Sequence, residues 1–255
     1  MRPEAWRGAG IALACLALLA GPARVEAKKD KPTAKGLSHD GMVNLCLAES
    51  LLRQKQPERA LEHARKAQRS DPQAPEVQLV LARLYSATGD ERKAEKSFDR
   101  ALKIAPTSGV VRNARAVWLC EHGQYDAAEA DFARAQRDVA YKNPQQAIAN
   151  AGRCAHRARR WAQAEQSLRH ALEFTPEDPQ LLFLLADASF QQGKLLEARA
   201  FVQRREALGA DGATLDLAAR IEAAAGDPVA SARYRALLRE GFPGYVPTGE
   251  GAAPP

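Results

Sequence analysis

The four cysteines and five histidines are the residues of this chain most able to bind a metal ion or to form a covalent bond. Cys46, Cys120 and Cys154 are not spaced like the ligand pairs of zinc sites, and the histidines are scattered along the chain. We therefore expect no metal and no cofactor. In an oxidising compartment Cys120 and Cys154 can form a disulfide, or each can be a small buried helix residue, and the sequence leaves both alternatives open.

Catalytic motifs are also missing from the sequence. It contains no phosphate-binding glycine loop, no helical zinc-protease motif and no nucleophile elbow, each of which has a fixed spacing. Most residues have a structural role in the repeat described below. The sequence therefore predicts a binding protein and not an enzyme.

The composition indicates helices as the elements that position these residues. Hydrophobic residues make up 45% of the 255 residues and charged residues 27%, whereas aromatic residues make up only 6%. Alanine, leucine, arginine and glutamate are abundant, and these residues lose little freedom on entering a helix. We expect an all-α protein with a sizeable core.

The N-terminal residues 1–27 are predicted to be an export signal. Arg2 and Arg7 precede an apolar run from Ile11 to Ala20, which is too short to span a bilayer. Small side chains before residue 28 place the cleavage after Ala27, and a retained membrane anchor is the alternative. Residues 28–39 read as a flexible linker and residues 243–255 as a disordered tail, because neither has apolar periodicity.

A repeat of about 34 residues runs through residues 40–242 and is clearest between Pro75 and Ser108. Its residues match the small, large and turn positions of a tetratricopeptide (TPR) unit: Leu81, Ala82, Tyr85, Gly89, Ala94, Phe98, Ala101 and Pro106. The same frame returns in neighbouring segments, with Gly123, Gly193 and Gly226 as further turn residues. The sequence predicts a TPR solenoid of about six helix-turn-helix repeats in a right-handed superhelix.

The first helix of each repeat is expected to line a concave wall that binds another protein. The candidate binding residues on this wall are apolar or positively charged: Leu45, Leu52, Leu79, Arg83, Val117, Arg153, Arg157, Phe183 and Phe190. The alternative is that half of the apolar ones contact neighbouring helices. Acidic residues alternate with the arginines along the wall, so the net charge of +6 is not gathered there and nucleic acid is disfavoured.

Three segments resemble the PilF/PilW family of type IV pilus biogenesis and stability proteins: residues 117–125, 149–154 and 195–200. The resemblance covers roughly residues 40–242 and includes the lengthened connection from Asp138 to Gln145. It implies a pilotin-like role, in which the protein assists outer-membrane localisation and multimerisation of the secretin and so supports twitching motility. The implied partner is the secretin subunit.

The same resemblance implies a place in the periplasm, in association with the outer membrane. Proteins of this family are commonly lipoproteins, and Cys15 is the only candidate for a lipid-modified cysteine in the N-terminal segment. If cleavage follows Ala27 instead, contact with the membrane is made only through the partner. We expect a monomer, and a generic periplasmic TPR adaptor for cell-envelope assembly is the alternative function.

Overall fold

The computed structural model describes residues 36–247, where the regular elements are α-helices. Twelve helices lie within these residues: α1 (His39–Arg53), α2 (Pro57–Ser70), α3 (Pro75–Ala87), α4 (Glu91–Ile104), α5 (Gly109–Glu121), α6 (Tyr125–Gln136), α7 (Pro144–Arg157), α8 (Trp161–Phe174), α9 (Pro179–Gln191), α10 (Leu195–Glu206), α11 (Gly212–Ala224) and α12 (Pro228–Gly241). None of them is both long and apolar enough to cross a membrane.

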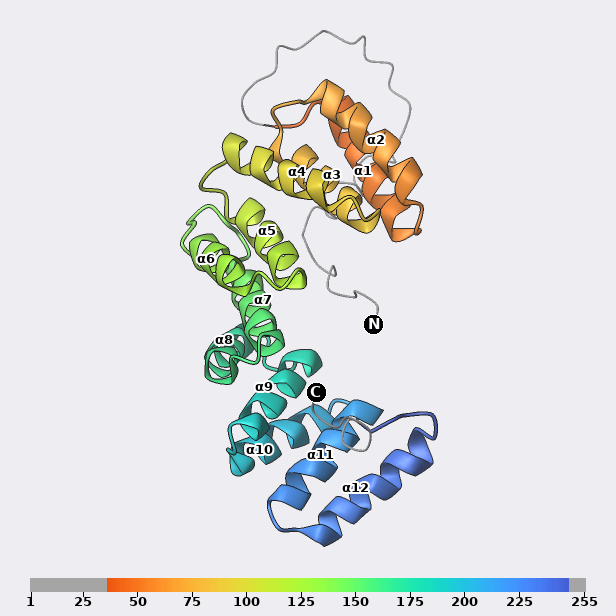
Figure 1. The fold of residues 1–255 in the computed structure, drawn as a ribbon, viewed down its shortest axis with the longest axis vertical. Coiled ribbons are helices and arrows are strands. Elements are labelled where there is room, and N and C mark those ends of the chain that lie inside the picture. The colour runs from red at the N-terminus through yellow and green to blue at the C-terminus, as the bar shows by residue number, and fades with distance from the viewer. Residues whose placement is uncertain (1–35, 248–255) are drawn as a thin grey trace. The chain divides into compact units, whose positions relative to one another are not determined.

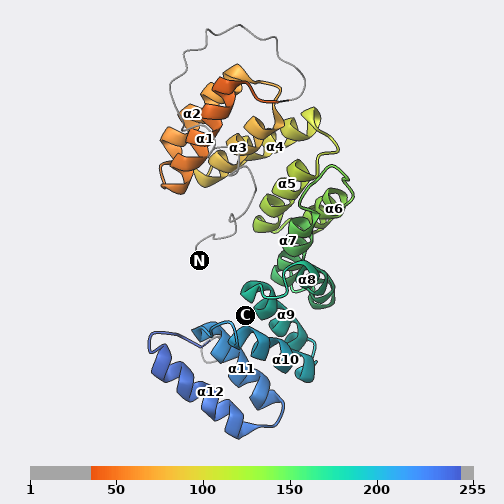
Figure 2. The same ribbon diagram turned by 180° about the vertical axis from the view of Figure 1, so that it is seen from behind.

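The helices divide into two compact units, one that ends at Ile104 and one that begins at Ala105. The first unit holds α1–α4 and the second holds α5–α12 (Figures 1 and 2). In both units each odd-numbered helix packs against the even-numbered helix that follows it, which makes one helix-turn-helix repeat. The chain is thus an all-α TPR solenoid of helix-turn-helix repeats, as the sequence predicted.

A residue with positive φ ends the first helix of each repeat. These turn residues are Lys55, Gly89, Gly123, Arg159, Gly193 and Gly226, which lie 34, 34, 36, 34 and 33 residues apart. The four glycines are those that the sequence predicted. Lys55 and Arg159 have φ values of 58° and 57°, a conformation that costs a residue with a Cβ more than it costs glycine.

Small residues let the two helices of a repeat approach closely. Seven residues before each turn residue lie Ala48, Ala82, Ala116, Gly152, Ala186 and Ala219, and five residues after it lie Ala60, Ala94, Ala128, Ala164, Ala198 and Ser231, all of them buried. A Cβ on Gly152 would lie 2.9 Å from Cδ2 of Leu168. Because there is no room for more atoms, larger side chains at these places would overpack the core.

The longest interval between turn residues is the one that leads from the third repeat to the fourth. Tyr141 of this connection is only 6% exposed and packs on Gly109, the first residue of α5. Burial raises the pKa of the Tyr141 hydroxyl to about 12. The Gly109 amide also donates a hydrogen bond to Oδ2 of Asp138 at 2.6 Å, so the connection is tied to the start of α5.

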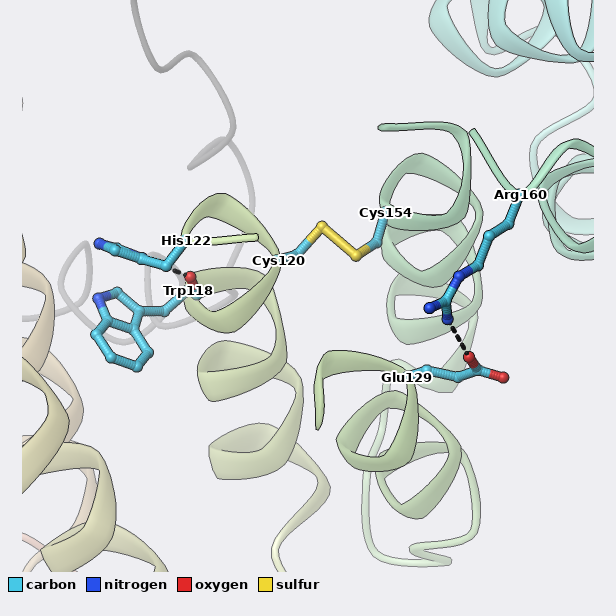
Figure 3. The surroundings of a disulfide bond; sticks show 6 residues. All are labelled: Trp118, Cys120, His122, Glu129, Cys154 and Arg160. Atoms are coloured by element: carbon cyan, nitrogen blue, oxygen red, sulfur yellow. Dashed lines mark hydrogen bonds and ion pairs between the residues drawn. A yellow bond between two sulfur atoms is a disulfide. The ribbon is translucent and has the colours of Figure 1, made fainter. Parts of the chain in front are cut away.

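A disulfide joins Cys120 of α5 to Cys154 of α7 (Figure 3), and this decides between the alternatives that the sequence left open. The two Cα atoms are 5.8 Å apart, and the residues are 34 positions apart in the chain. Cys120 lies three residues before its turn residue and Cys154 lies five before its own. The bond therefore links different places of consecutive repeats.

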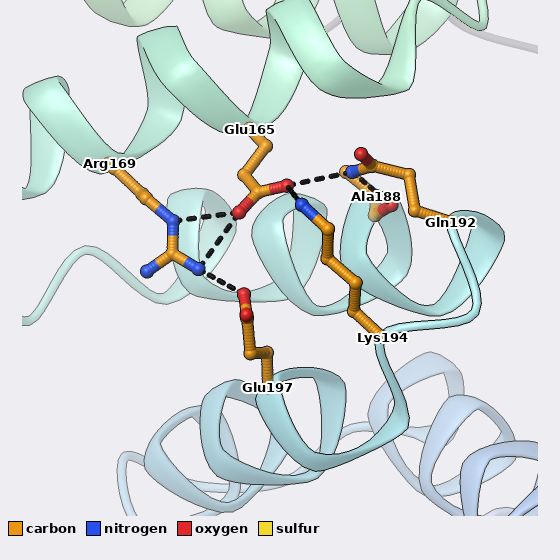
Figure 4. A network of polar contacts seen from close by, with 6 residues as sticks. All are labelled: Glu165, Arg169, Ala188, Gln192, Lys194 and Glu197. Atoms are coloured by element: carbon orange, nitrogen blue, oxygen red, sulfur yellow. Dashed lines mark hydrogen bonds and ion pairs between the residues drawn. The ribbon is translucent and has the colours of Figure 1, made fainter.

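A polar network joins the fourth repeat to the fifth (Figure 4). The buried carboxylate of Glu165 on α8 accepts hydrogen bonds from Nζ of Lys194 at 2.7 Å and from Nε2 of Gln192 at 2.8 Å, both in the turn between α9 and α10. Arg169 binds Glu165 at 2.9 Å and also pairs with Glu197 of α10. Although burial opposes ionisation, these donors lower the pKa of Glu165 to about 2.

Both ends of the described chain differ from the predicted boundaries. Ser38 is the N-cap of α1 and its hydroxyl binds Asp71 at 2.7 Å, so ordered structure includes the last residues of the predicted linker. At the other end Tyr245 is half-buried against the core of the second unit. Because Tyr245 is a single apolar contact outside any periodic pattern, the apolar periodicity of the sequence could not reveal it. Residues 1–35 and 248–255, including the predicted export signal and Cys15, lie outside the described residues.

Candidate protein-binding surface

The predicted wall residues recur at fixed places on the first helices, counted back from the turn residue. Six residues before it lie Glu49, Arg83, Val117, Arg153, Asp187 and Arg220. Ten residues before it lie Leu45, Leu79, Asn113, Ala149, Phe183 and Asp216, and three residues before it lie Leu52, Ser86, Cys120, His156, Phe190 and Ala223. Because the three places are three or four residues apart, they share one side of each helix. We call this side the inner wall and treat each unit by itself.

In the first unit the inner wall is mainly polar. Nη1 of Arg83 on α3 donates to Oε1 of Glu49 on α1 at 3.2 Å, and their side chains are 19% and 10% exposed. This pair links the two repeats at the place six residues before the turn. Leu52 is half-buried and packs against the core of the first unit.

Leu45 and Leu79 are not available on the surface as the sequence predicted. They are only 2% and 5% exposed, and Leu45 belongs to the core of the first unit. The physical reason is that α1 and α3 pack directly together in the first unit, where Leu45 joins a core built from α1, α2 and α3. The structure here agrees with the alternative that part of the apolar set contacts neighbouring helices.

In the second unit α9 provides the apolar part of the inner wall. Phe183 and Phe190 are both half-buried on it, one turn on either side of Asp187. The guanidinium of Arg220 on α11 lies 5.1 Å from the centre of the Phe190 ring, within the range of a cation–π contact. Two aromatic side chains with charged neighbours suit the binding of a peptide or of a helix from another protein.

A histidine–carboxylate pair crosses the wall between α7 and α9. Nε2 of His156 lies 2.8 Å from Oδ2 of Asp187, and Nε2 of Gln191 donates to the other carboxylate oxygen at 3.1 Å. Burial opposes ionisation of Asp187, but these hydrogen bonds and the nearby Arg220 outweigh it, so the pKa of Asp187 is below its ordinary 3.8. The pair was not among the predicted binding residues, although both residues fall at wall places of the repeat.

The predicted arginines of α7 have different surroundings. Arg153 is held by Oε1 of Gln180 and Oδ1 of Asn150, both at 3.3 Å, and lies 3.7 Å from Asp178. Burial lowers its pKa, and Asp178 opposes this effect. Arg157 is exposed at the end of the helix, whereas Val117 on α5 is half-buried.

Arginines lie along α7 and just after its end, and they contact different neighbouring helices. Arg160 binds Glu129 of α6 at 3.0 Å (Figure 3). It also pairs with Asp126 of the same helix. Arg153 and His156 bind acidic or polar groups of the next repeat on the inner wall. Within the described residues, the charges of Arg153 and Arg160 are therefore engaged in contacts with neighbouring repeats. Within residues 36–247 no three His, Cys, Asp or Glu side chains come together in a way that could hold a metal ion.

Paired helices, small residues at fixed places and regular turn residues define a tetratricopeptide-repeat protein, a class whose members bind other proteins. Family models described as tetratricopeptide repeats match residues 51–118 and 150–213. The first match runs from the first unit into α5 of the second, and the second match lies within the second unit, so both units have this character.

More specific likenesses come from type IV pilus proteins. The chain is 22% identical to the type IV pilus assembly protein PilF of Pseudomonas aeruginosa over 71% of this chain and 73% of PilF. The crystal structure of PilW, described as a widely conserved type IV pilus biogenesis factor, is 26% identical, with a TM-score of 0.75 over 82% of this chain and 96% of PilW. A Pseudomonas aeruginosa PilF structure superposes with a TM-score of 0.71 at 21% identity, over 81% of this chain and 93% of that one. These likenesses confirm the predicted resemblance to the PilF/PilW proteins.

Proposed function

We propose that this chain is a protein-binding scaffold of type IV pilus biogenesis with a pilotin-like role. In this role it assists outer-membrane localisation and multimerisation of the secretin and binds the secretin subunit. The observation that carries the proposal is the likeness to PilW, which extends over nearly the whole of that protein. We propose the inner wall of the second unit as the binding surface, because Phe183 and Phe190 are half-buried there among charged residues.

The predicted location follows from the same role. A chain that acts on the secretin has to reach the periplasm, and the predicted export signal in residues 1–27 would bring it there. Contact with the outer membrane would come through the secretin or through a lipid on Cys15. We propose binding and not catalysis, in keeping with the TPR repeats.

Deletion of the gene tests the role. We expect secretin monomers at normal levels, few heat-resistant secretin multimers and loss of twitching motility, because assembly and not synthesis needs the scaffold. Multimer formation is measured by gel electrophoresis of unboiled membranes and immunoblotting. Normal multimers in the deletion strain would exclude the pilotin-like role and leave the generic envelope adaptor as the alternative. Co-purification would then identify the partner of that adaptor.

Substitutions on α9 test the binding surface. We expect Phe183→Asp and Phe190→Asp to reduce capture of the purified secretin at least about tenfold, since burying a carboxylate in an apolar contact is unfavourable. Phe174→Asp is the matched control, because this phenylalanine is 53% exposed at the end of α8 and lies outside the inner wall. Leu79→Asp is unsuitable, since a charge at a buried site would unfold the first unit. Equal capture by all three variants would show that α9 is not the binding surface.

A further inference from the structure

The last repeat exposes a surface that its counterparts in the second unit cover. In that unit α7 packs on α6, α9 packs on α8 and α11 packs on α10. Nine residues after their turn residues, the second helices carry Phe132, Leu168 and Val202, each at most 1% exposed. The corresponding residue of α12 is Arg235, which is exposed. An apolar position of the repeat is thus a cation in α12, the last helix of residues 36–247.

An open hollow of about 370 Å³ lies on this surface between α11 and α12. Small residues and two arginines line it: Ala223, Pro228, Ser231, Ala232, Arg235 and Arg239. Ser231 turns its hydroxyl inward, where it donates to the Ala219 carbonyl at 2.8 Å. The small side chains leave room for the backbone of another helix to approach, as they do inside each repeat.

The arginines of the hollow are both exposed and stand one turn apart on α12. Within residues 36–247 neither Arg235 nor Arg239 has a carboxylate partner. Two cations four residues apart match two carboxylates with the same spacing on a facing helix. The charge of this surface therefore favours an acidic partner.

The chain itself covers the other end of the same face of α11. The ring of Tyr245 packs on Gly212, where an added Cβ would lie 2.7 Å from Cδ2 of the tyrosine. Burial raises the pKa of Tyr245, and the nearby Asp216 and Asp211 act in the same direction. The segment after α12 thus closes the start of α11, and the hollow beside Ala223 stays open at its end.

We propose that this hollow binds an acidic amphipathic helix of a partner protein, which stacks on α11 and α12 as the first helix of a further repeat would. Three features support a helix with acidic residues: the helical cover of every counterpart in the unit, the small residues that permit close approach, and the two arginines. The site is distinct from the aromatic part of the inner wall on α9, so it provides a second binding surface.

A synthetic helix tests the proposal on the full-length protein. The probe is a lactam-bridged alanine-based peptide of about 15 residues with two glutamates four residues apart on one face. Binding is measured by fluorescence anisotropy at low and high salt. We expect saturable binding that weakens with salt. Arg235→Glu should weaken it at least about tenfold, and so should Ala232→Trp, which fills the hollow without changing its charge.

Matched controls separate this site from general attraction to a basic protein. Arg233→Glu makes the same charge change on another side of α12 and should leave binding within about twofold. A peptide with glutamines in place of the glutamates should bind at least tenfold more weakly, as should a proline-containing acidic peptide that cannot form a helix. Absence of saturation at about 1 mM probe, or equal losses from Arg233→Glu and Arg235→Glu, would overturn the proposal, provided that circular dichroism shows all variants to be folded.

Discussion

Two consecutive junctions of the second unit join similar repeats by different means. Between the third and fourth repeats, the Cys120–Cys154 disulfide links α5 to α7, and Tyr141 packs a lengthened connection onto Gly109. Between the fourth and fifth repeats there is no added length, and the buried carboxylate of Glu165 collects donors from the next turn. The irregular junction has the covalent bond in addition to the ion pairs of Arg160, whereas the regular one has an ionic network around Glu165. The comparison indicates that helix packing alone holds two repeats together less firmly where the interval between them is longer than usual.

The largest expected effect comes from the irregular junction. Replacement of both Cys120 and Cys154 by alanine should lower the free energy of unfolding by about 3 to 4 kcal/mol, the chain-entropy estimate for a cross-link across 34 residues. Urea unfolding under non-reducing conditions measures the change. Reductant should also destabilise the wild-type protein, and an unchanged unfolding curve of the double variant would mean that packing alone secures this junction.

Removal of the charge at the regular junction should have a smaller effect. Glu165→Gln keeps the shape of the side chain but removes the negative charge and one of the two acceptor oxygens that bind Lys194 and Arg169, so a loss of about 1 to 3 kcal/mol is expected in the same unfolding experiment. Glu197→Gln is the control, since this partner of Arg169 is 46% exposed and its loss should cost at most about 1 kcal/mol. Equal effects of the two substitutions would contradict the central place of Glu165.

The pH dependence of stability sharpens the same comparison. The pKa of Glu165 is about 2 in the folded protein against an ordinary 4.5, so the folded state binds this proton less readily than the unfolded state. The stabilisation is therefore complete above about pH 5.5 and is lost as the pH falls toward about 2. Thermal melts of wild type and Glu165→Gln should converge over that range, and parallel curves would assign the acid sensitivity to other carboxylates.

The smallest expected effect concerns a turn residue and has the opposite sign. Arg159→Gly should raise the free energy of unfolding by about 0.5 to 1 kcal/mol, since glycine adopts positive φ without the strain of a Cβ. Lys55→Gly should act in the same way in the first unit, whereas Gly123→Ala should destabilise by about 1 kcal/mol. Chemical denaturation of the three variants is the measurement, and a destabilised Arg159→Gly would indicate that the arginine side chain has a further role.

The sequence predicted the repeat and the fold because their signals are periodic. Small residues such as Ala94 and turn glycines such as Gly123 recur at intervals that a single chain reveals. Lys55 and Arg159 adopt the same turn conformation, but lysine and arginine have no preference for positive φ. Their role as turn residues therefore became clear only from the coordinates. For the same reason the packing of Tyr245 on Gly212 was not visible in the pattern.

The sequence could predict which residues share the inner side of each first helix, but not which of them are exposed. Helical spacing correctly brought Phe183 and Phe190 to the same side, yet it could not tell how close α1 and α3 approach, which is what buries Leu45 and Leu79. The pairing of His156 with Asp187 depends on contacts between consecutive first helices. Whether these residues bind the secretin stays a prediction for the capture experiments above.

The disulfide between Cys120 and Cys154 makes the stability of the fold depend on the redox conditions around the protein. Where thiols are kept reduced, the fourth repeat is held to the third only by side-chain contacts and opens more readily. Once oxidation joins the two sulfur atoms, opening requires a much larger fluctuation. The same polypeptide is thus easier to unfold in reducing surroundings than in oxidising ones, without any change in its amino acids.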